Sequence, residues 1–316
     1  MSIIEIKHLT FAYPGAEKNT LNDVNLEIEK GDFVAIVGNN GCGKSTLCKT
    51  LNGLIPHFIT GSYSGSVVAD QVNVQDSEIG ILARKVGYVY QDFENQIVRP
   101  TVLDDASYAC MNYAMPDYLE RGRKALVQCG LEGKEKEYIW QLSGGQTHLL
   151  ALAGGVSLEP EILILDEPIA QLDPHHADLI YKILRNLNEK YGKTILVIEH
   201  HTEYIAEYCK HVVLMKDEHV EWKKRTKEAL SRVEELQSCN IFPPQVTLAA
   251  YEMVKRNVIP KPELLPSSME DGINLLGGLV CQQRGNDTGA GNFKHEKIVQ
   301  FKNVSVSYRA VKGKAY

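Results

Sequence analysis

The chain has 316 residues, which is enough for one large domain or two small ones. Its residues are 44% hydrophobic and 23% charged, as in ordinary globular proteins. A formal net charge of -6 provides no basic field for nucleic acid, and no apolar run approaches the roughly 20 residues of a membrane-spanning helix.

The beginning of the chain predicts three strands. Residues 3–13 (IIEIKHLTFAY) alternate in polarity, with Ile4, Ile6 and His8 on one face, as in an exposed-edge or meander strand; they begin as a strand and not as a signal peptide. Residues 22–29 predict a second strand. Residues 32–37 (DFVAIV) are continuously apolar, which is typical of a strand buried on both faces.

Residues 38–46 (GNNGCGKST) follow this apolar strand and lead into a helix predicted at residues 44–52. This is the Walker A pattern, Gly-x-x-x-x-Gly-Lys-Ser/Thr, in the strand–loop–helix context of a phosphate-binding loop. Its glycines let the backbone curl so that consecutive N–H groups and the helix N-terminus face an anion. The alternative is a glycine-rich turn without a ligand. The predicted nucleotide-binding residues are Gly38, Asn39, Asn40, Gly41, Cys42, Gly43, Lys44, Ser45 and Thr46.

Individual residues of this loop have separate expected roles. Lys44 is expected to reach the outer phosphates of a nucleoside triphosphate, and the Ser45 hydroxyl to hold Mg²⁺. Cys42 is either a reactive thiol or, more simply, a small bystander. The seven cysteines form no CxxC pair and no metal-ligand spacing, which favours reduced thiols in a cytosol over a disulfide framework.

The middle of the chain changes from strands to helices. Residues 61–74 are β-prone and interrupted by Gly and Ser, and residues 84–91 contain a strand that ends on a glutamine. From about residue 101 to residue 157 the spacing is helical, with helices predicted at residues 102–113 and 118–129.

Strands then return at residues 162–166, 194–198 and 212–215, with a helix at residues 177–189. An α/β core interrupted by a helical insertion is the simplest interpretation. Past residue 221 the core pattern stops.

The last part of the chain predicts helices and then a linker. A charged amphipathic helix is expected at residues 225–237 and a short helix at residues 246–257, followed by a proline-rich loop. Residues 282–292 (QQRGNDTGAGN) have the composition of a flexible linker. Residues 298–308 (IVQFKNVSVSY) then align without gaps on residues 3–13. Two amphipathic strands can resemble each other by chance, but the position after a linker favours the first strand of a second, similar domain.

Residues 163–168 (LILDEP) place two carboxylates at the C-terminal end of an apolar strand, where ligands bind in open α/β sheets. Asp166 can hold Mg²⁺ through water, and Glu167 would then face the γ-phosphate and orient the attacking water as general base. The alternative is a carboxylate pair that only caps the strand end.

Residues 142–146 (LSGGQ) provide another anion-binding pattern. The serine should start a helix, and the two glycines leave the first N–H groups of that helix open to an anion. An ordinary serine cap with a flexible turn would have the same residues. Because the motif lies in the helical insertion, we expect it to act on a nucleotide held by another molecule. Its residues are Leu142, Ser143, Gly144, Gly145 and Gln146.

In this order, Walker A, LSGGQ and LDEP resemble the motifs of the nucleotide-binding domain of ABC ATPases, over about residues 1–222. The resemblance implies that Tyr13 stacks on adenine and that Gln91 is the Q-loop glutamine, which touches Mg²⁺ or water and couples to a membrane partner. It also implies that Asp173 belongs to the D-loop and that His200 is the switch histidine at the γ-phosphate. Taken singly, Tyr13 could also be an aromatic residue on the surface, and His200 could be a histidine at the end of a loop. The catalytic residues are then Glu167, His200 and Gln91, and the metal-binding residues are Ser45, Gln91 and Asp166.

The chain departs from the family pattern at a few positions. Thr147 and His148 follow LSGGQ, where basic or amide side chains are usual. Ile169 occupies a place often held by Ser or Thr. Glu199 and His201 flank the switch histidine, where Thr and Asp are commoner. None of these changes removes a catalytic group, and all concern the geometry of the dimer interface.

The resemblance implies an α/β fold: a P-loop NTPase domain of the ABC type, with a RecA-like core, an antiparallel β subdomain and a helical subdomain. We expect this domain at residues 1–222, with the helical subdomain at about residues 95–157. A small C-terminal helical extension would cover residues 223–280. A flexible linker at residues 281–297 and the start of a truncated second ABC domain at residues 298–316 would follow.

Finer features resemble one subgroup, the energy-coupling factor ATPases. Residues 91–98 (QDFENQIV) resemble their Q-loop region, which often carries a PENQ-like run, and residues 244–269 resemble their small C-terminal extension. That group drives uptake of vitamins and of transition-metal ions such as cobalt or nickel. Some of its members are tandem fusions of two ATPase domains, which fits the repeat at residues 298–308.

The implied function is ATP binding and hydrolysis that powers a membrane transporter, with ATP and Mg²⁺ as cofactors. Two ATP molecules would be sandwiched between the phosphate loop of one domain and LSGGQ of a second domain, in a homodimer or with a paralogous or tandem copy. The subunit would lie peripherally on the cytoplasmic face of the cell membrane. Its integral membrane partners would be separate polypeptides, because the chain has no span of its own.

Two other classes of ABC ATPase share these motifs. A soluble tandem ATPase acting on the ribosome (the ABC-F group) also has two domains on one chain, but it would favour a long charged helical linker and a basic surface for RNA. DNA-repair ABC ATPases need a long coiled coil between Walker A and LSGGQ, and the roughly 100 residues between those motifs are too few for one.

Overall fold

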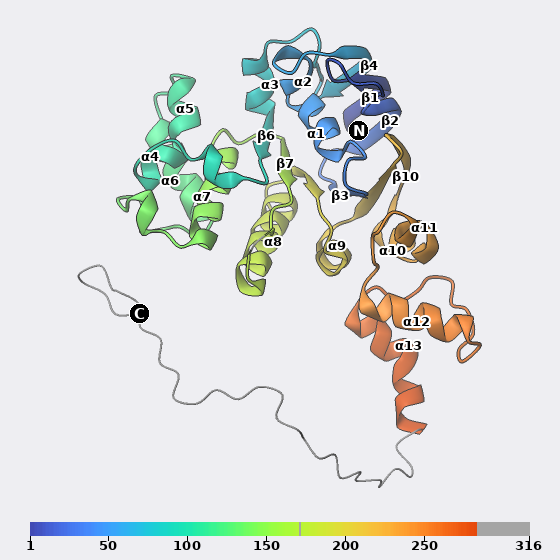
Figure 1. Cartoon of the computed structure of the whole chain (residues 1–316). Helices are drawn as coiled ribbons and strands as arrows, with labels where there is room; N and C mark the ends of the chain where they lie inside the picture. The colour runs from blue at the N-terminus through green and yellow to red at the C-terminus, as the bar shows by residue number, and fades with distance from the viewer. Residues whose placement is uncertain (171, 283–316) are drawn as a thin grey trace, which may run out of the picture. The chain divides into compact units, whose positions relative to one another are not determined.

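The computed structural model describes residues 1–170 and 172–282, with side-chain packing up to Leu275. Met1–Leu276 form one compact unit (Figure 1). Within the described ranges, no helix combines the length and the apolar character needed to cross a membrane. The elements, in chain order, are β1 (Ser2–Ala12), β2 (Leu21–Glu29), β3 (Phe33–Gly38), α1 (Lys44–Leu51), α2 (Leu54–His57), β4 (Ser62–Ala69), β5 (Val72–Asn73), α3 (Ile79–Lys85), β6 (Val86–Val89), η1 (Phe93–Gln96), α4 (Val102–Ala106), α5 (Tyr108–Asn112), α6 (Tyr118–Gln128), η2 (Ile139–Gln141), α7 (Gly144–Val156), β7 (Ile162–Asp166), α8 (Pro174–Glu189), β8 (Thr194–Ile198), α9 (Thr202–Tyr208), β9 (His211–Lys216), β10 (His219–Arg225), α10 (Thr226–Leu230), α11 (Val233–Ser238), α12 (Gln245–Lys255) and α13 (Met269–Gln282).

Two sheets organise the fold. The larger sheet has the order β10-β9-β3-β8-β7-β6, and its neighbouring strands are parallel except for β10 with β9. The smaller sheet has the order β2-β1-β4-β5 and is antiparallel throughout. Because parallel strands end at the same edge of a sheet, the residues that follow β3, β6, β7 and β8 gather there. The α/β core, antiparallel sheet and helical part expected from the sequence are all present.

The first strand differs from the expected exposed-edge strand, because β1 lies between β2 and β4. Its register shifts around His8, which has a left-handed φ of 51°. Ile4 and Ile6 before the shift and Leu9 and Phe11 after it are all buried, whereas His8 is exposed. The bulge therefore keeps the apolar residues on the core face and turns His8 out, away from the face predicted for it.

The apolar run of β3 is explained by burial of both faces of the larger sheet. Phe33, Ala35 and Val37 belong to one hydrophobic cluster, which also contains residues of α7 and α8. Val34 and Ile36 belong to a second cluster, which also contains residues of α1 and of the smaller sheet. Successive side chains of a strand point to opposite faces, so a strand covered on both sides has no polar position.

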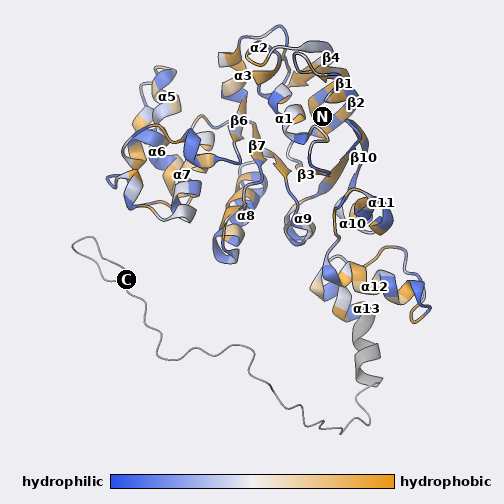
Figure 2. Ribbon diagram, in the orientation of Figure 1, coloured by the Kyte–Doolittle hydropathy of each residue, from blue (hydrophilic) through white to orange (hydrophobic). Residues whose placement is uncertain are grey.

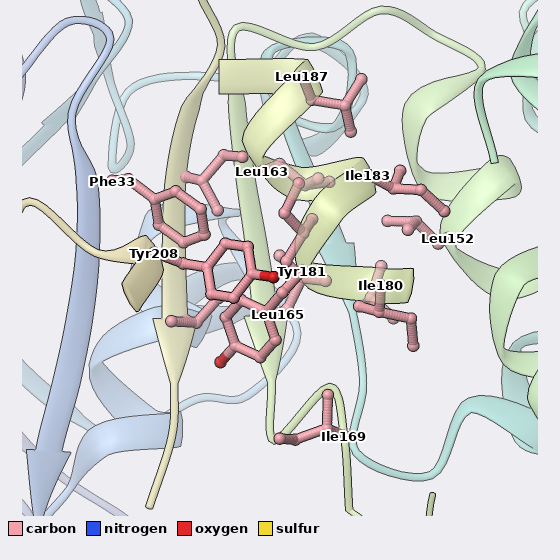
Figure 3. Packing of buried hydrophobic residues seen from close by; sticks show 14 of the residues in the cluster. Phe33, Leu152, Leu163, Leu165, Ile169, Ile180, Tyr181, Ile183, Leu187 and Tyr208 are labelled. Carbon is pink, nitrogen blue, oxygen red and sulfur yellow. The ribbon is translucent and has the colours of Figure 1, made fainter. Parts of the chain in front are cut away.

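The helix α8 closes the first of these clusters. Figure 2 shows hydrophobic and hydrophilic residues alternating along α8, as expected of a helix with one buried face. Figure 3 shows Ile180 and Ile183 of α8 near Leu152 of α7, and Tyr181 near Leu165 of β7. This packing fixes the strand that delivers the predicted carboxylates.

The helical part is more interrupted than expected. The single helix predicted at residues 102–113 is two short helices, α4 and α5, separated at Ser107. The Ser107 hydroxyl donates to the carbonyl oxygen of Leu103, and α6 crosses so closely that a Cβ atom on Gly122 would lie 2.7 Å from the Ser107 Cβ. The tertiary approach of α6 therefore overrides the local helical spacing.

The C-terminal part also differs from the prediction. The helix expected at residues 225–237 is divided into α10 and α11, and it follows β10, which continues the larger sheet to Arg225. Apolar residues of α10, α11 and the turn after them belong to the same hydrophobic cluster as Phe33, α7 and α8, which we call the main hydrophobic cluster. The core therefore continues past residue 222. A separate small cluster, containing Val233, Ala250 and Leu265, supports α12. The helix α13 lies mostly within the helical extension expected at residues 223–280, although no individual helix was predicted there. The predicted linker and second-domain start lie, beyond Gln282, outside the described residues.

Candidate functional site

The Walker A loop joins β3 to α1 at the carboxyl edge of the larger sheet (Figure 1). Gly38 and Gly43 have positive φ values of 151° and 99°. A Cβ atom on Gly38 would lie 2.2 Å from the carbonyl oxygen of Met215, and one on Gly43 would lie 2.6 Å from that of Thr20. The close approach of neighbouring backbone, together with the left-handed φ, therefore requires glycine at both positions.

Lys44, the first residue of α1, lies folded over this loop. Its side chain is buried, and its Nζ donates to the carbonyl oxygens of Gly38 and Asn39 at 2.8 and 3.0 Å. Both acceptors are neutral, so the lysine keeps a positive charge at the place where the loop N–H groups and the helix N-terminus would bind an anion.

Tyr13 follows β1 and is tied directly to the start of α1. Its hydroxyl lies 3.1 Å from the Thr46 Oγ1, and its ring packs edge-on against Phe11 with ring centroids 5.0 Å apart. The structure therefore places the predicted adenine-stacking residue beside the predicted phosphate loop, although Tyr13 and Thr46 are 33 positions apart in the sequence.

Three predicted catalytic residues converge behind the loop. The Gln91 Nε2 donates to one Glu167 carboxylate oxygen at 2.9 Å, and the His200 Nε2 lies 3.4 Å from the other. Gln91 follows β6, Glu167 follows β7 and His200 follows β8, so the parallel sheet brings them together. Glu167 has a left-handed φ of 50°, and its N–H donates to the carbonyl oxygen of Ile198 at 3.0 Å.

Asp166 ends β7 next to this group and is almost fully buried. One of its carboxylate oxygens accepts a hydrogen bond from the Tyr88 hydroxyl at 3.3 Å. Together with the Ser45 hydroxyl and the Gln91 amide oxygen, it supplies a donor set made only of oxygen atoms. Such a set suits a hard cation such as Mg²⁺, so the residues present fit the predicted metal.

Two hollows flank the phosphate loop and share Glu167. One is lined by residues of the loop together with Thr20, Gln91 and Glu167. The other is lined by Asn39, Glu167, His200, Cys239, Asn240 and Ile241, among others. The turn at residues 239–241 follows α11, and no motif in the sequence indicated that this turn would border the site.

Cys42 lies inside the loop, and its thiol is buried. Burial is the main cause that raises the pKa of the Cys42 thiol above its usual range. A thiol that is harder to ionise is less nucleophilic, which favours the interpretation of Cys42 as a bystander.

Glu199 is a buried carboxylate, and its position in the sequence indicated only a departure from the family pattern. It accepts hydrogen bonds from the backbone N–H groups of His200 and His201 at 2.7 and 2.9 Å, and from the Tyr181 hydroxyl at 2.9 Å. Its hydrogen bond with the His201 ring is the main cause that raises the pKa of His201. Glu199 thus fixes the backbone that carries His200.

The LSGGQ residues lie at the start of α7, where Ser143 is the N-cap. The Ser143 hydroxyl accepts from the Gln146 N–H, and the Gln146 side chain accepts from the Ser143 N–H, which completes a capping box. A Cβ atom on Gly144 would meet no atom within 4 Å, so the helix start is open there. None of these residues lines either hollow around the phosphate loop.

The predicted D-loop residue Asp173 caps α8 and lies beside this motif. Its carboxylate accepts from the N–H groups of His175 and His176 and is bound to the His176 ring. The His176 ring in turn packs over Gly145, where an added Cβ atom would lie 2.2 Å from the ring. The structure therefore joins LSGGQ and the D-loop into one surface.

A protein-family model described as ABC transporter matches residues 21–170. A putative ABC transporter ATP-binding protein of Pyrococcus abyssi is 35% identical over 260 residues, which cover 82% of this chain and 93% of the relative. The energy-coupling factor transporter ATP-binding protein EcfA2 of Clostridium perfringens is 34% identical, covering 80% and 89%. A putative ABC transporter ATP-binding protein of Methanosarcina acetivorans is 36% identical, but the match covers 77% of this chain and only 40% of that longer protein.

Solved structures of similar proteins have the same fold. CbiO1 of Clostridium perfringens, described as part of the ABC transporter complex CbiONQ, superposes with a TM-score of 0.67 and 30% identity, covering 82% of this chain and 99% of CbiO1. The ATP-binding cassette MJ0796, solved as a dimer in a post-hydrolysis state with ADP and Pi, gives a TM-score of 0.62 and 28% identity, covering 71% and 98%.

Proposed function

The chain belongs to the ABC transporter ATP-binding proteins, and from this premise we propose that it powers an energy-coupling factor importer of vitamins or of cobalt or nickel ions. It is an ATP hydrolase of the ABC type. The importer class is supported by the likeness to EcfA2 and CbiO1 and by the Q-loop run at residues 91–98.

The observation that carries the catalytic proposal is the convergence of Gln91, Glu167 and His200 behind the phosphate loop. In this scheme Tyr13 stacks on adenine, and the loop N–H groups with Lys44 bind the phosphates. Ser45, Asp166 and Gln91 would hold Mg²⁺, which when bound offsets the charge of the phosphates.

Glu167 is the proposed general base. Its carboxylate lies between Gln91 and His200, so it can accept a proton from a water molecule held near the γ-phosphate. His200 contacts the γ-phosphate and holds the other side of the Glu167 carboxylate. Gln91, the other partner of Glu167, is expected to turn from the carboxylate to Mg²⁺ or water when ATP binds, which links the glutamine loop to the state of the nucleotide.

The LSGGQ residues and Asp173 are proposed to act on a nucleotide held by a second ABC domain. In the sheet order, β8 and β7 separate β3, which leads into the phosphate loop, from β6 at the edge. Figure 1 shows α7 and α1 on opposite sides of β6 and β7. Two domains facing each other would bring LSGGQ of each to the phosphate loop of the other. The second domain is either another copy of this chain or a paralogous or tandem domain; the longer Methanosarcina relative is consistent with the tandem form.

Separate integral membrane subunits are the proposed transport partners, with this subunit on the cytoplasmic face of the membrane. A further hollow borders the glutamine loop and is lined largely by apolar and aromatic side chains of α3, β6, α5 and α7. Tyr90, Gln96 and Val98, which lie in and around the glutamine loop, line it as well. A helix of a membrane subunit seated there would contact the glutamine loop directly. The ribosome-associated alternative is disfavoured by the net charge of -6. Co-sedimentation with membranes and not with ribosomes would distinguish the two.

Light scattering on the Glu167→Gln variant with and without MgATP tests the sandwich. The amide removes the base but keeps the shape of the side chain, so a closed dimer should accumulate and the mass should double with ATP. Adding Lys44→Ala to the same chain is the control, because loss of the phosphate contact should abolish the doubling. A Glu167→Gln chain that binds ATP but stays monomeric would exclude the homodimer and favour a different ATPase domain as the partner.

A further inference from the structure

Two aromatic side chains are exposed immediately before LSGGQ. Trp140 is 72% exposed and Tyr138 is 46% exposed. Their rings stack on each other, with centroids 4.5 Å apart and an angle of 11° between the ring planes. Large aromatic side chains that remain exposed in a folded domain mark a contact surface more often than an isolated exposed aliphatic residue does.

The backbone holds this pair in a fixed position. Tyr138 pairs with Thr101 in a β-bridge, and the Ile139 N–H donates to the carbonyl oxygen of Pro100 at 3.1 Å. Ile139 of η2 and Leu142, directly after η2, point inward and pack against the hydrophobic cluster that contains α7 and α8. The inner residues thus anchor the turn, and the two rings on its outer side form a preorganised platform.

The position of the platform indicates what covers it. Trp140 lies two residues before Leu142 and three before Ser143, the N-cap that is proposed to face a nucleotide of another ABC domain. On the receiving domain, Tyr13 lies beside Thr46 and is proposed to stack on one face of adenine. The other face of the base is then open toward the domain that supplies LSGGQ.

We propose that the Tyr138–Trp140 platform of one ABC domain packs on the nucleotide base held by the facing domain, with Trp140 against the base. The inference rests on the proposed sandwich, in which LSGGQ contacts the phosphates of the nucleotide. It adds a contact to the base of the same nucleotide. Every nucleobase has an apolar face that can stack on an aromatic ring, so this contact favours a bound nucleotide with little dependence on which base it carries.

The test uses the full chain with Glu167→Gln and measures the ATP concentration that gives half-maximal dimer in light scattering. Trp140→Ala should raise that concentration roughly tenfold, which corresponds to about 1.4 kcal/mol for the loss of one base-stacking aromatic side chain. Phe58→Ala is the matched control: Phe58 is also 72% exposed but lies after α2, outside the proposed contact, and its change should leave the concentration unaltered.

A second measurement reports on Trp140 directly. Trp222→Phe leaves Trp140 as the only tryptophan of the chain. In the Glu167→Gln background, ATP should quench the Trp140 fluorescence in step with dimer formation, and inorganic tripolyphosphate, which has no base, should not produce this quenching.

The outcomes separate this proposal from the sandwich itself. If Trp140→Ala dimerises at the same ATP concentration as its parent, or if dimer forms without a change in Trp140 fluorescence, the base contact is wrong while the sandwich stands. If the parent itself binds ATP but never dimerises, the homodimeric sandwich is wrong, and the Trp140 contact is overturned with it.

Discussion

At the scale of single residues, Glu199 is the side chain on which the position of His200 depends. Its carboxylate is buried and holds the N–H groups of His200 and His201 while accepting from Tyr181 of α8. A buried carboxylate is costly unless several donors satisfy it, and here those donors belong to the backbone of the switch loop and to the core. Removing the carboxylate would free the loop and leave buried N–H groups without an acceptor.

We therefore predict that Glu199→Ala lowers the kcat of ATP hydrolysis by roughly tenfold or more, because loss of one buried hydrogen-bonding partner costs about 1–3 kcal/mol and His200 loses its fixed position. Glu199→Gln keeps an oxygen for the two N–H groups and should retain most of the activity. Steady-state hydrolysis and thermal unfolding, measured on both variants, check the expectation. Equal loss of activity in the two variants would mean that the charge of Glu199, and not its hydrogen bonds to the loop, is what matters.

At the scale of elements, the contact between η1 and α7 joins the glutamine loop to the helix of LSGGQ. The ring of His148 in α7 stacks on Phe93 of η1 with ring centroids 4.2 Å apart. His148 is buried, and neither of its ring nitrogens has a hydrogen-bond partner within the described residues. Burial lowers the pKa of His148 to about 4, so the ring is neutral at physiological pH. His148, one of the departures from the family pattern, thus forms an aromatic contact between the helix of LSGGQ and the glutamine loop.

This contact predicts a pH dependence of stability. The unfolded chain binds a proton at His148 near pH 6.5 and the folded chain only near pH 4, so stability falls as the pH drops from about 6.5 towards 4. At pH 5, protonation of His148 in the unfolded chain is expected to lower the free energy of unfolding by about 2 kcal/mol. His148→Phe keeps the stacking ring but cannot titrate. Denaturant unfolding at pH 7.5 and pH 5 should therefore show that the parent loses about 2 kcal/mol more than His148→Phe. An identical loss in both proteins would contradict a neutral, buried His148.

At the scale of the whole molecule, the structure moves a part of the expected C-terminal extension into the core. Ala229, Leu230, Leu236, Cys239 and Ile241 are buried in the main cluster with the strands of the larger sheet. The Thr202 hydroxyl at the start of α9 donates to the carbonyl oxygen of Phe242 at 2.7 Å, which fastens the end of this segment next to the switch loop. Residues from α12 onward instead pack with Val233 of α11 in a separate small cluster.

Two truncations test this division. A chain that ends at residue 222 loses Leu230, Leu236 and Ile241, whose burial contributes roughly 1.5–3 kcal/mol each, together with the smaller Ala229 and Cys239. The summed loss is comparable with a total stability of about 5–15 kcal/mol. We expect this chain to be unfolded or insoluble. A chain that ends at residue 242 keeps those side chains and the Thr202 contact, and should remain folded and bind ATP with a lower melting temperature. Circular dichroism and nucleotide binding are the measurements, and a stable, ATP-binding chain that ends at residue 222 would refute the shared core.

The sequence by itself determined the nucleotide chemistry and the order of most elements. A phosphate loop depends on residues that are adjacent in the chain, such as Gly38, Gly43 and Lys44, and a strand buried on both faces shows as the apolar run of β3. Tertiary structure alone decided the 2.9 Å approach of Gln91 to Glu167, the hydrogen bond of Tyr181 to the buried Glu199 and the burial of His148. It also decided the break at Ser107 and the place of α10 and α11 in the core. These features depend on contacts between residues far apart in the chain, which leave no trace in the local periodicity from which helices and strands are predicted.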